Sequence, residues 1–248
     1  MSGHSKWSTI KHKKQATDAR RGQLFTRLAR EIEIAARDGG DPDMNVRLRL
    51  AMDKARSANM PKDNIDRAIK RGTGELKGDE LHEILYEAYG PHGVAMLILV
   101  VTDNRNRSTA DVRRIFNKNG GNLAEPGAVA WQFKRKGYIS LPASEDGDRI
   151  FEIALDANAE DVIFGDEMIE IYADLESFQP VQRALAAHAV PIDGAEIAYV
   201  ADLPVSLPRE NAFQVMRIVD QLEELDDVQQ VFSALDIDDA LVAAYEDR

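Results

Sequence analysis

Residues 138–202 decide the fold of much of the chain, and they read YISLPASEDGDRIFEIALDANAEDVIFGDEMIEIYADLESFQPVQRALAAHAVPIDGAEIAYVAD. Four short segments in this stretch are predicted strands: 138–142, 161–164, 168–173 and 195–202. Segments 146–157 and 176–188 are predicted helices. The resulting order, β-α-β-β-α-β, is that of the split βαβ, ferredoxin-like arrangement. The stretch therefore predicts an α+β domain.

Residues 1–22 have no clear hydrophobic period and are predicted to form an extended arm, and the rest of the chain before residue 78 has helical patterns only. Leu24, Leu28 and Ile32 recur at every fourth position, which is typical of a helix with one buried side. Stop and start signals predict three helices: from about Arg20 to Gly39, from Pro42 to about Ala58 with Asp41 as its cap, and from Pro61 to Gly72. We predict a basic three-helix domain at residues 1–77, with a glycine-rich hinge at 72–78.

Two further segments are each too small for a domain. Residues 78–136 contain predicted strands at 84–89, 94–102 and 128–135 and a helix at 107–119, whereas residues 205–248 add one helix (about 209–224) and one strand (about 228–234). We expect these segments to form one discontinuous ferredoxin-like domain, 78–136 plus 205–248, with an acidic domain, 137–204, inserted in it. The predicted fold class is multidomain α and α+β: an N-terminal three-helix domain followed by two ferredoxin-like α+β domains, one inserted in the other.

The composition is that of a soluble globular protein, with 44% hydrophobic and 30% charged residues. The chain has no cysteine, which excludes disulfides, thiolate zinc sites, iron–sulfur clusters and cysteine nucleophiles. The longest apolar run, 94–101, is too short to cross a bilayer, and no export segment follows the basic N-terminal residues. We expect a cytoplasmic protein without a membrane partner.

Charge is distributed unevenly along the 248 residues. The net charge is −12, but residues 1–77 carry +8, residues 137–204 carry −13 and residues 205–248 carry −8. Such asymmetry predicts a basic end that binds a polyanion. For the acidic parts, solubility is a sufficient explanation.

The strongest candidate site is this basic end, because residues 1–30 hold eight Lys and Arg against one acid. Phosphate backbones are bound by such a density of cations. Helical geometry places the arginines of the first helix opposite its apolar stripe. Trp7 either stacks on a nucleobase or anchors the arm, and the lysines alternatively form a solvated tail. The predicted contacts are Lys6, Trp7, Lys11, His12, Lys13, Lys14, Arg20, Arg21, Arg27 and Arg30.

A second basic cluster surrounds the start of the 107–119 helix. Arginine and asparagine bind phosphates and base edges, and a helix N-terminus adds backbone donors. The alternative, a polar loop and the outer face of an amphipathic helix, is favoured. The candidate secondary contacts are Arg105, Arg107, Arg113 and Arg114.

Signals of catalysis are missing from the sequence. The five histidines have no metal-ligand spacing, and the acidic clusters near 226 and 236 lack the pattern of a calcium loop. The chain matches no phosphate-binding loop and no nucleophile elbow. We therefore predict no enzyme, no cofactor, no metal and no small-molecule substrate. An adaptor that binds proteins through its acidic face is the hypothesis from another class.

Several long motifs cover essentially the whole chain: GHSKW (3–7), IKHKK (10–14), RLRLA (47–51), ANMPKDNI (58–65), IKRGTG (69–74), Gly90-Pro91, DNRNR (103–107), GGNL (120–123) and LDDVQ (225–229). They resemble the motifs of the YebC/PmpR family, whose mitochondrial relative is the translational activator of cytochrome c oxidase. The departures are small: Ala124 in place of a glycine, Ala128 in place of a serine and Ala234 in place of an asparagine.

The resemblance implies a three-domain, non-enzymatic protein whose members are described as DNA-binding transcriptional regulators. A second description within the family is a ribosome-associated translation factor that assists elongation through proline runs. The expected partner is therefore DNA or ribosomal RNA, with the ribosome itself as a candidate. A groove reader needs one recognition helix, whereas here the basic residues are spread over an arm, a helix and loops, which suits a folded RNA at least as well.

Overall fold

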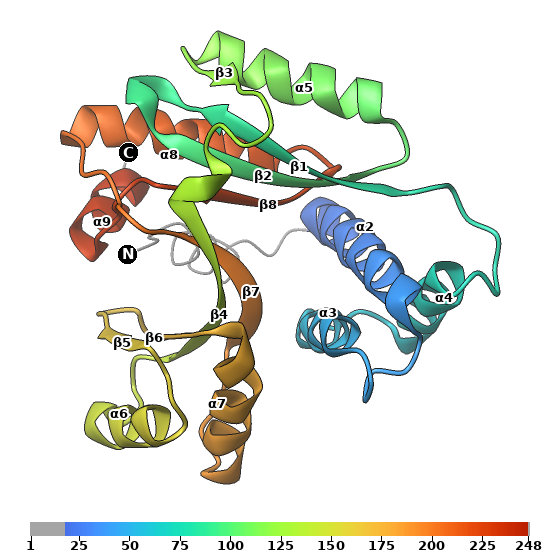
Figure 1. The fold of residues 1–248 in the computed structure, drawn as a ribbon, viewed down its shortest axis with the longest axis vertical. Helices are drawn as coiled ribbons and strands as arrows, with labels where there is room; N and C mark the ends of the chain where they lie inside the picture. Colours follow the sequence, from blue (N-terminus) through green and yellow to red (C-terminus); the bar gives the residue numbers. More distant parts are fainter. Residues whose placement is uncertain (1–17, 248) are drawn as a thin grey trace. The chain divides into compact units, whose positions relative to one another are not determined.

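The computed structural model describes residues 18–247, with side chains from residue 21 onward. The chain divides into two compact units (Figure 1). Of the described residues, 18–130 and 210–233 form the larger unit, and 131–209 and 234–247 form the smaller unit. Within residues 18–247, no helix has the length and apolar character needed to span a membrane.

The larger unit begins with a three-helix bundle. Its helices are α2 (Asp18–Ala35), α3 (Val46–Ser57) and α4 (Lys62–Gly72), and a 3-10 turn, η1 (Ala36–Asp38), ends α2. Leu28, Ile32 and Leu48 are 2% exposed or less and pack with Ile65 of α4 in one core. Burial of the predicted stripe of α2 thus forms the centre of the bundle.

The start of α3 differs from the prediction. The helix begins at Val46 rather than at Pro42, and Asn45 is its N-cap, with its Oδ1 accepting a hydrogen bond from the Leu48 N–H. The Asn45 amide also donates to the carbonyls of Ala35 and Gly39, at 2.7 and 2.8 Å. Asn45 therefore closes the end of α2 while it caps α3, and Asp41 forms a turn instead.

Gly72 lies where α4 meets α2. A Cβ atom at this position would be 2.3 Å from the Glu33 carbonyl oxygen and 2.6 Å from the Ala36 Cβ. The absence of a side chain thus permits the close approach of the two helices. This glycine, predicted to begin a hinge, has a packing role.

The sheet of the larger unit is antiparallel, in the order β3-β1-β2-β8. α5 and α8 cover it (Figure 1), with a short 3-10 turn, η2 (Pro91–Gly93), between β1 and β2. Because β8 pairs with β2, the end of the chain returns to this sheet after the insertion. The bounds are β1 (His82–Tyr89), β2 (Ala95–Thr102), α5 (Arg105–Lys118), β3 (Asn122–Leu123), α8 (Arg209–Glu223) and β8 (Val228–Ser233).

Glu87 of β1 fixes the segment that leaves this sheet. Its carboxylate accepts hydrogen bonds from the backbone N–H groups of Gly127, Val129 and Ala130, at 2.5, 2.7 and 2.8 Å. Burial alone would raise the pKa of Glu87, but these three donors bring it below its ordinary value. An ionised side chain thus holds the turn around Ala128.

The smaller unit has a second antiparallel sheet, in the order β5-β6-β4-β7. Its elements follow the predicted β-α-β-β-α-β order, so the multidomain α and α+β fold class is confirmed. Their bounds are β4 (Phe133–Pro142), α6 (Gly147–Asp156), β5 (Asp161–Phe164), β6 (Met168–Ala173), α7 (Leu175–Ala187) and β7 (Gly194–Ala201).

β4 corrects the prediction of separate strands at 128–135 and 138–142. One strand runs through Gly137, where a Cβ atom would be 2.2 Å from the Phe178 ring. The glycine therefore admits an aromatic ring of α7 against the sheet. Residues 130–132 form a 3-10 turn, η3, instead of a strand.

The C-terminal helix α9 (Asp239–Glu246) was not predicted. Asp238, which belongs to the acidic cluster near 236, is its N-cap and accepts a hydrogen bond from the Leu241 N–H at 2.7 Å. Residues 234–247 group with the smaller unit. The division into domains at 77, 136 and 204 stays a prediction.

Candidate nucleic-acid interface

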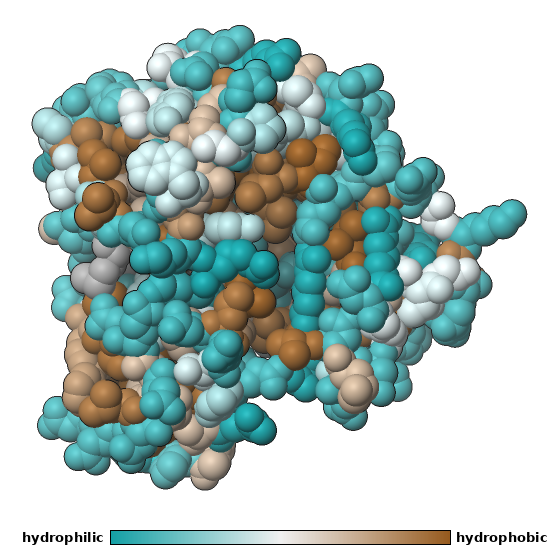
Figure 2. All heavy atoms as spheres, in the orientation of Figure 1, coloured by the Kyte–Doolittle hydropathy of each residue, from teal (hydrophilic) through white to brown (hydrophobic). Residues whose placement is uncertain are grey.

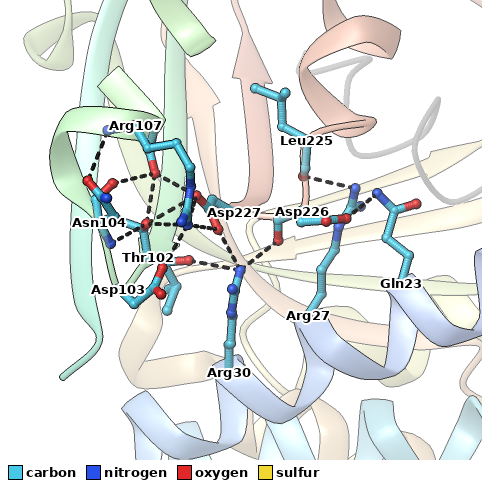
Figure 3. Close-up of polar contacts among 12 residues, drawn as sticks. Gln23, Arg27, Arg30, Thr102, Asp103, Asn104, Arg107, Leu225, Asp226 and Asp227 are labelled. Carbon is cyan, nitrogen blue, oxygen red and sulfur yellow. Dashed lines mark hydrogen bonds and ion pairs between the residues drawn. The ribbon is translucent and has the colours of Figure 1, made fainter. Parts of the chain in front are cut away.

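The arginines of α2 project from the side of the helix that the bundle core leaves uncovered. Leu28 and Ile32 turn into the core, and Arg27 and Arg30 turn away from it. In Figure 3 both side chains rise from α2 toward the loop between α8 and β8 and toward the end of β2. The arginine face of α2 therefore packs against the α+β part of the same unit.

Arg27 and Gln23 hold this loop through its backbone. Arg27 Nη2 donates to the carbonyls of Glu223 and Leu225, the second at 3.2 Å. Gln23 Nε2 donates to the Glu224 carbonyl at 2.8 Å and to Asp226 Oδ1 at 2.7 Å. Burial is the main cause that lowers the pKa of Arg27. Through these hydrogen bonds to backbone carbonyls, Arg27 holds α2 against the loop between α8 and β8.

Arg30 makes an ion pair between α2 and the loop that precedes β8. Its Nη1 lies 2.7 Å from Asp227 Oδ1 and also donates to the Asp226 carbonyl at 3.0 Å. The side chains of Arg30 and Asp227 are 20% and 11% exposed. Partly buried ion pairs with several hydrogen bonds are strongly orienting.

Asp227 is the centre of the network in Figure 3. Its carboxylate accepts hydrogen bonds from Ser108 Oγ at 2.6 Å, from Arg107 Nη2 at 2.9 Å and from Thr102 Oγ1 at 3.1 Å, besides that of Arg30. Burial would raise the pKa of Asp227, but the hydrogen bonds and the Arg30 charge together lower it. The carboxylate therefore joins α2, β2 and α5 at the start of β8.

The 103–107 segment completes this network from the other side. Asn104 is the N-cap of α5 and accepts a hydrogen bond from the Arg107 N–H at 3.1 Å. Arg107 Nη2 contacts Asp103 Oδ1 at 2.7 Å as well as Asp227. The segment thus caps α5 and takes part in a network of intramolecular ion pairs.

The structure places the predicted contacts in three groups. Arg21 is exposed, with its guanidinium 5.9 Å from the centre of the Phe25 ring. Arg27 and Arg30, expected on an open face, contact the 223–227 loop instead, because a second layer of the fold covers that face. The side chains outside the described part are Lys6, Trp7, Lys11, His12, Lys13, Lys14 and Arg20. The nucleic-acid role of all these residues stays a prediction.

The secondary cluster is divided in the same way. Arg107 contacts Asp227, Arg105 contacts His82 Nδ1 at 3.0 Å, and Arg114 contacts Asp111 at 3.0 Å. Arg113 is exposed on α5. Hydrophilic side chains dominate the surface over α5 in Figure 2, as the outer face of an amphipathic helix requires.

Sequence reasoning missed the cations of α4. Lys62, Arg67, Lys70 and Arg71 are all exposed, and within the described residues Arg67 and Lys70 form no ion pair. The signal was present, but basic residues near the end of a helix also complement its dipole. Among residues 18–247, no three potential metal-binding side chains gather.

Comparison with known proteins places the chain. Residues 5–75 match the family model described as the TACO1/YebC protein N-terminal domain, and residues 81–235 match the TACO1/YebC second and third domain. The chain belongs to the TACO1/YebC family. The polar network around Asp227 in Figure 3 therefore joins the two matched regions. It connects α2 of the first region to β2, α5 and β8 of the second.

Relatives in the family are close over their full lengths. A protein of Trichlorobacter lovleyi named "Probable transcriptional regulatory protein" is 52% identical, over 96% of both chains. One of Acidithiobacillus ferrooxidans with the same name is 52% identical, over 99% of both. The crystal structure of a conserved hypothetical protein from Aquifex aeolicus has a TM-score of 0.83 at 46% identity and covers 89% of this chain and 92% of its own.

Proposed function

We propose that this TACO1/YebC protein is a non-enzymatic regulator of gene expression that acts by binding nucleic acid through its basic N-terminal arm and the adjoining helices. One observation carries the proposal: residues 1–30 hold eight Lys and Arg against one acid in a chain whose net charge is −12. Exposed cations of α2 and α4, Arg21, Arg67 and Lys70, extend this basic region. Counterion release from phosphates is the expected source of affinity.

DNA is the target that the relatives' name, transcriptional regulatory protein, suggests. A reader of the major groove places one helix in the groove with side chains on base edges. Arg27 and Arg30 of α2 are engaged inside the unit, so this face of α2 is unavailable to a groove.

RNA is the second candidate, and the docking of α2 favours it. The cations that stay exposed are spread over the start of α2, the length of α4 and part of α5. A dispersed surface fits the irregular shape of folded RNA better than the regular groove of a duplex. On this reading the protein is a translation factor that binds ribosomal RNA.

Fluorescence anisotropy with labelled duplex DNA and labelled structured RNA tests the proposal. We expect binding whose logarithmic affinity falls steeply with the logarithm of the salt concentration. Lys11→Glu with Lys13→Glu should abolish it at physiological salt. The matched control, Arg183→Glu with Arg217→Glu, makes the same charge change at two exposed positions and should retain binding. An arm variant that binds as tightly as the unaltered protein would overturn the proposal.

A further inference from the structure

A groove lies between α2 and α4 within the larger unit. Its volume is about 310 Å³, which is at the lower end of the range for small-ligand pockets. Two helical stripes border it. Phe25 and Ala29, four residues apart, line it from α2, and Asn64, Arg67 and Arg71 line it from α4 at the spacing of one helix face.

The inner wall of the groove is apolar. Phe25 is half-buried, Met60 is 6% exposed, and Ala29, whose side chain is a single methyl group, also lines the groove. Flat aromatic ligands stack on walls of this kind, and aromatic side chains are the usual platforms for bases of single strands. The space therefore suits a planar ring.

The outer edge of the groove is polar and cationic. Arg67 and Arg71 are exposed, and Asn64 is half-buried. A guanidinium pair one turn apart matches the oxygens of a phosphate, and an amide offers both a donor and an acceptor to a base edge. The groove thus offers a pair of cations for a phosphate, an amide for the edge of a base and an apolar wall for the face of a base.

Three carboxylates also border the groove, and two of them, Glu33 and Asp103, have cationic neighbours. Asp103 is paired with Arg107 at 2.7 Å. Glu33 is 8% exposed, and burial raises its pKa against the opposing effects of Arg71 and Arg37. Asp79 is exposed to solvent. A carboxyl oxygen accepts hydrogen bonds from the amino groups of bases.

We propose that the α2–α4 groove binds one unpaired nucleotide, with the base against Phe25 and Ala29, its edge at Asn64 and its phosphate at Arg67 and Arg71. The inference rests on the proposed function and deepens it, because it specifies single-stranded nucleic acid as the preferred form. Paired bases are stacked in a duplex and cannot enter the groove. The arm supplies general affinity, and the groove supplies the preference for unpaired bases.

Three labelled probes test this: a 12-nucleotide RNA, the DNA of the same sequence, and a blunt DNA duplex containing that sequence. Anisotropy titrations should show at least one of the single strands bound about tenfold more tightly than the duplex. If the RNA alone is preferred, the 2′-hydroxyl takes part; if both strands are, the base and phosphate suffice. Both results support the groove.

Two variants locate the effect. Ala29→Leu fills the groove without a charge change and should weaken single-strand binding by about tenfold while duplex binding stays within about twofold. Ala110→Leu, at an exposed site of α5, is its control and should change neither. Arg67→Gln with Arg71→Gln, at exposed positions, should lower the single-strand preference even if Ala29→Leu fails to fold.

The control for the arginine pair lies on the same helix. Lys62→Gln with Lys70→Gln removes two exposed charges that do not line the groove, so it should weaken single strands and duplex equally. Equal affinity of the unaltered protein for single strands and duplex, or equal effects of the two α4 pairs, would overturn the groove assignment. Failure to bind any probe would instead overturn the proposed function.

Discussion

Arg30 Nη1 lies 2.7 Å from Asp227 Oδ1, across 197 residues of sequence. The pair fixes the α2 arginine face to the start of β8, and Asp227 simultaneously receives Ser108, Thr102 and Arg107. A carboxylate with four donors at 11% exposure is costly to disrupt, because each donor would lose its partner at a largely buried acceptor.

Asp227→Asn should therefore lower the free energy of unfolding by about 3 kcal/mol. An amide cannot balance two guanidinium groups, and its NH₂ group opposes the other donors. Urea unfolding measures the loss. The control is Asp53→Asn, at an ion pair with Arg56 in which both side chains are 59% exposed, and it should cost no more than about 0.5 kcal/mol. Equal losses at the two sites would contradict the role given to Asp227.

Stability should depend on acid pH through the same carboxylate. The folded-state pKa of Asp227 is lowered from its ordinary 3.8, so its contribution is complete above that value and is lost as the pH falls through the lower folded pKa. As the pH falls below 3.8, the unaltered protein should therefore lose more unfolding free energy than Asp227→Asn does. Glu33, whose pKa is raised, affects both proteins alike. Parallel pH profiles from urea titrations would contradict the prediction.

Arg30→Gln should separate docking from binding. The loss of its pair with Asp227 should lower the unfolding free energy by about 2 kcal/mol, whereas the affinity of the folded protein for duplex DNA should stay within about twofold. Lys11→Glu with Lys13→Glu should show the opposite pattern, with affinity lost and stability kept. Paired unfolding and anisotropy measurements decide. An Arg30→Gln protein that is fully stable but no longer binds nucleic acid would contradict this prediction and would make Arg30 a nucleic-acid contact.

The position of Arg30 also shows how much of the site could be predicted from the sequence. Helical periodicity correctly placed Leu28 and Ile32 in the bundle core and the arginines opposite them. Periodicity within one helix says nothing of a second layer, and the 223–227 loop that covers the arginines is nearly 200 residues away. The basic composition of this face of α2 therefore predicted exposure to solvent, whereas in the fold the arginines contact backbone carbonyls and a carboxylate.

Local signals misled in a similar way where tertiary contacts decided. Asp41 and Asn45 are both good caps, and Asn45 prevails because its amide also reaches the carbonyls of Ala35 and Gly39. Separate strands were predicted at 128–135 and 138–142, but β4 runs through Gly137, which accommodates the Phe178 ring. The fold class depends on longer patterns, and it was predicted correctly.

Gly72→Ala should destabilise the bundle by about 2 kcal/mol, because the added Cβ would meet the Glu33 carbonyl at 2.3 Å and force α4 away from α2. Gly22→Ala is the matched control in the same domain. It lies within α2 with no atom within 4 Å of the new Cβ, so it should raise stability by about 0.5–1 kcal/mol. Thermal unfolding monitored by circular dichroism compares the two, and a neutral Gly72→Ala would contradict the close packing described.

Crosslinking in the protein's own cells tests the central claim most directly. The unaltered protein and the Lys11→Glu, Lys13→Glu variant are irradiated, purified under denaturing conditions, and the recovered nucleic acid is sequenced. The account predicts nucleic acid enriched with the unaltered protein and lost with the variant: ribosomal RNA for a translation factor, discrete promoter DNA for a transcriptional regulator. Recovery no greater than that of the variant, under conditions where a known nucleic-acid-binding protein is crosslinked, would contradict it.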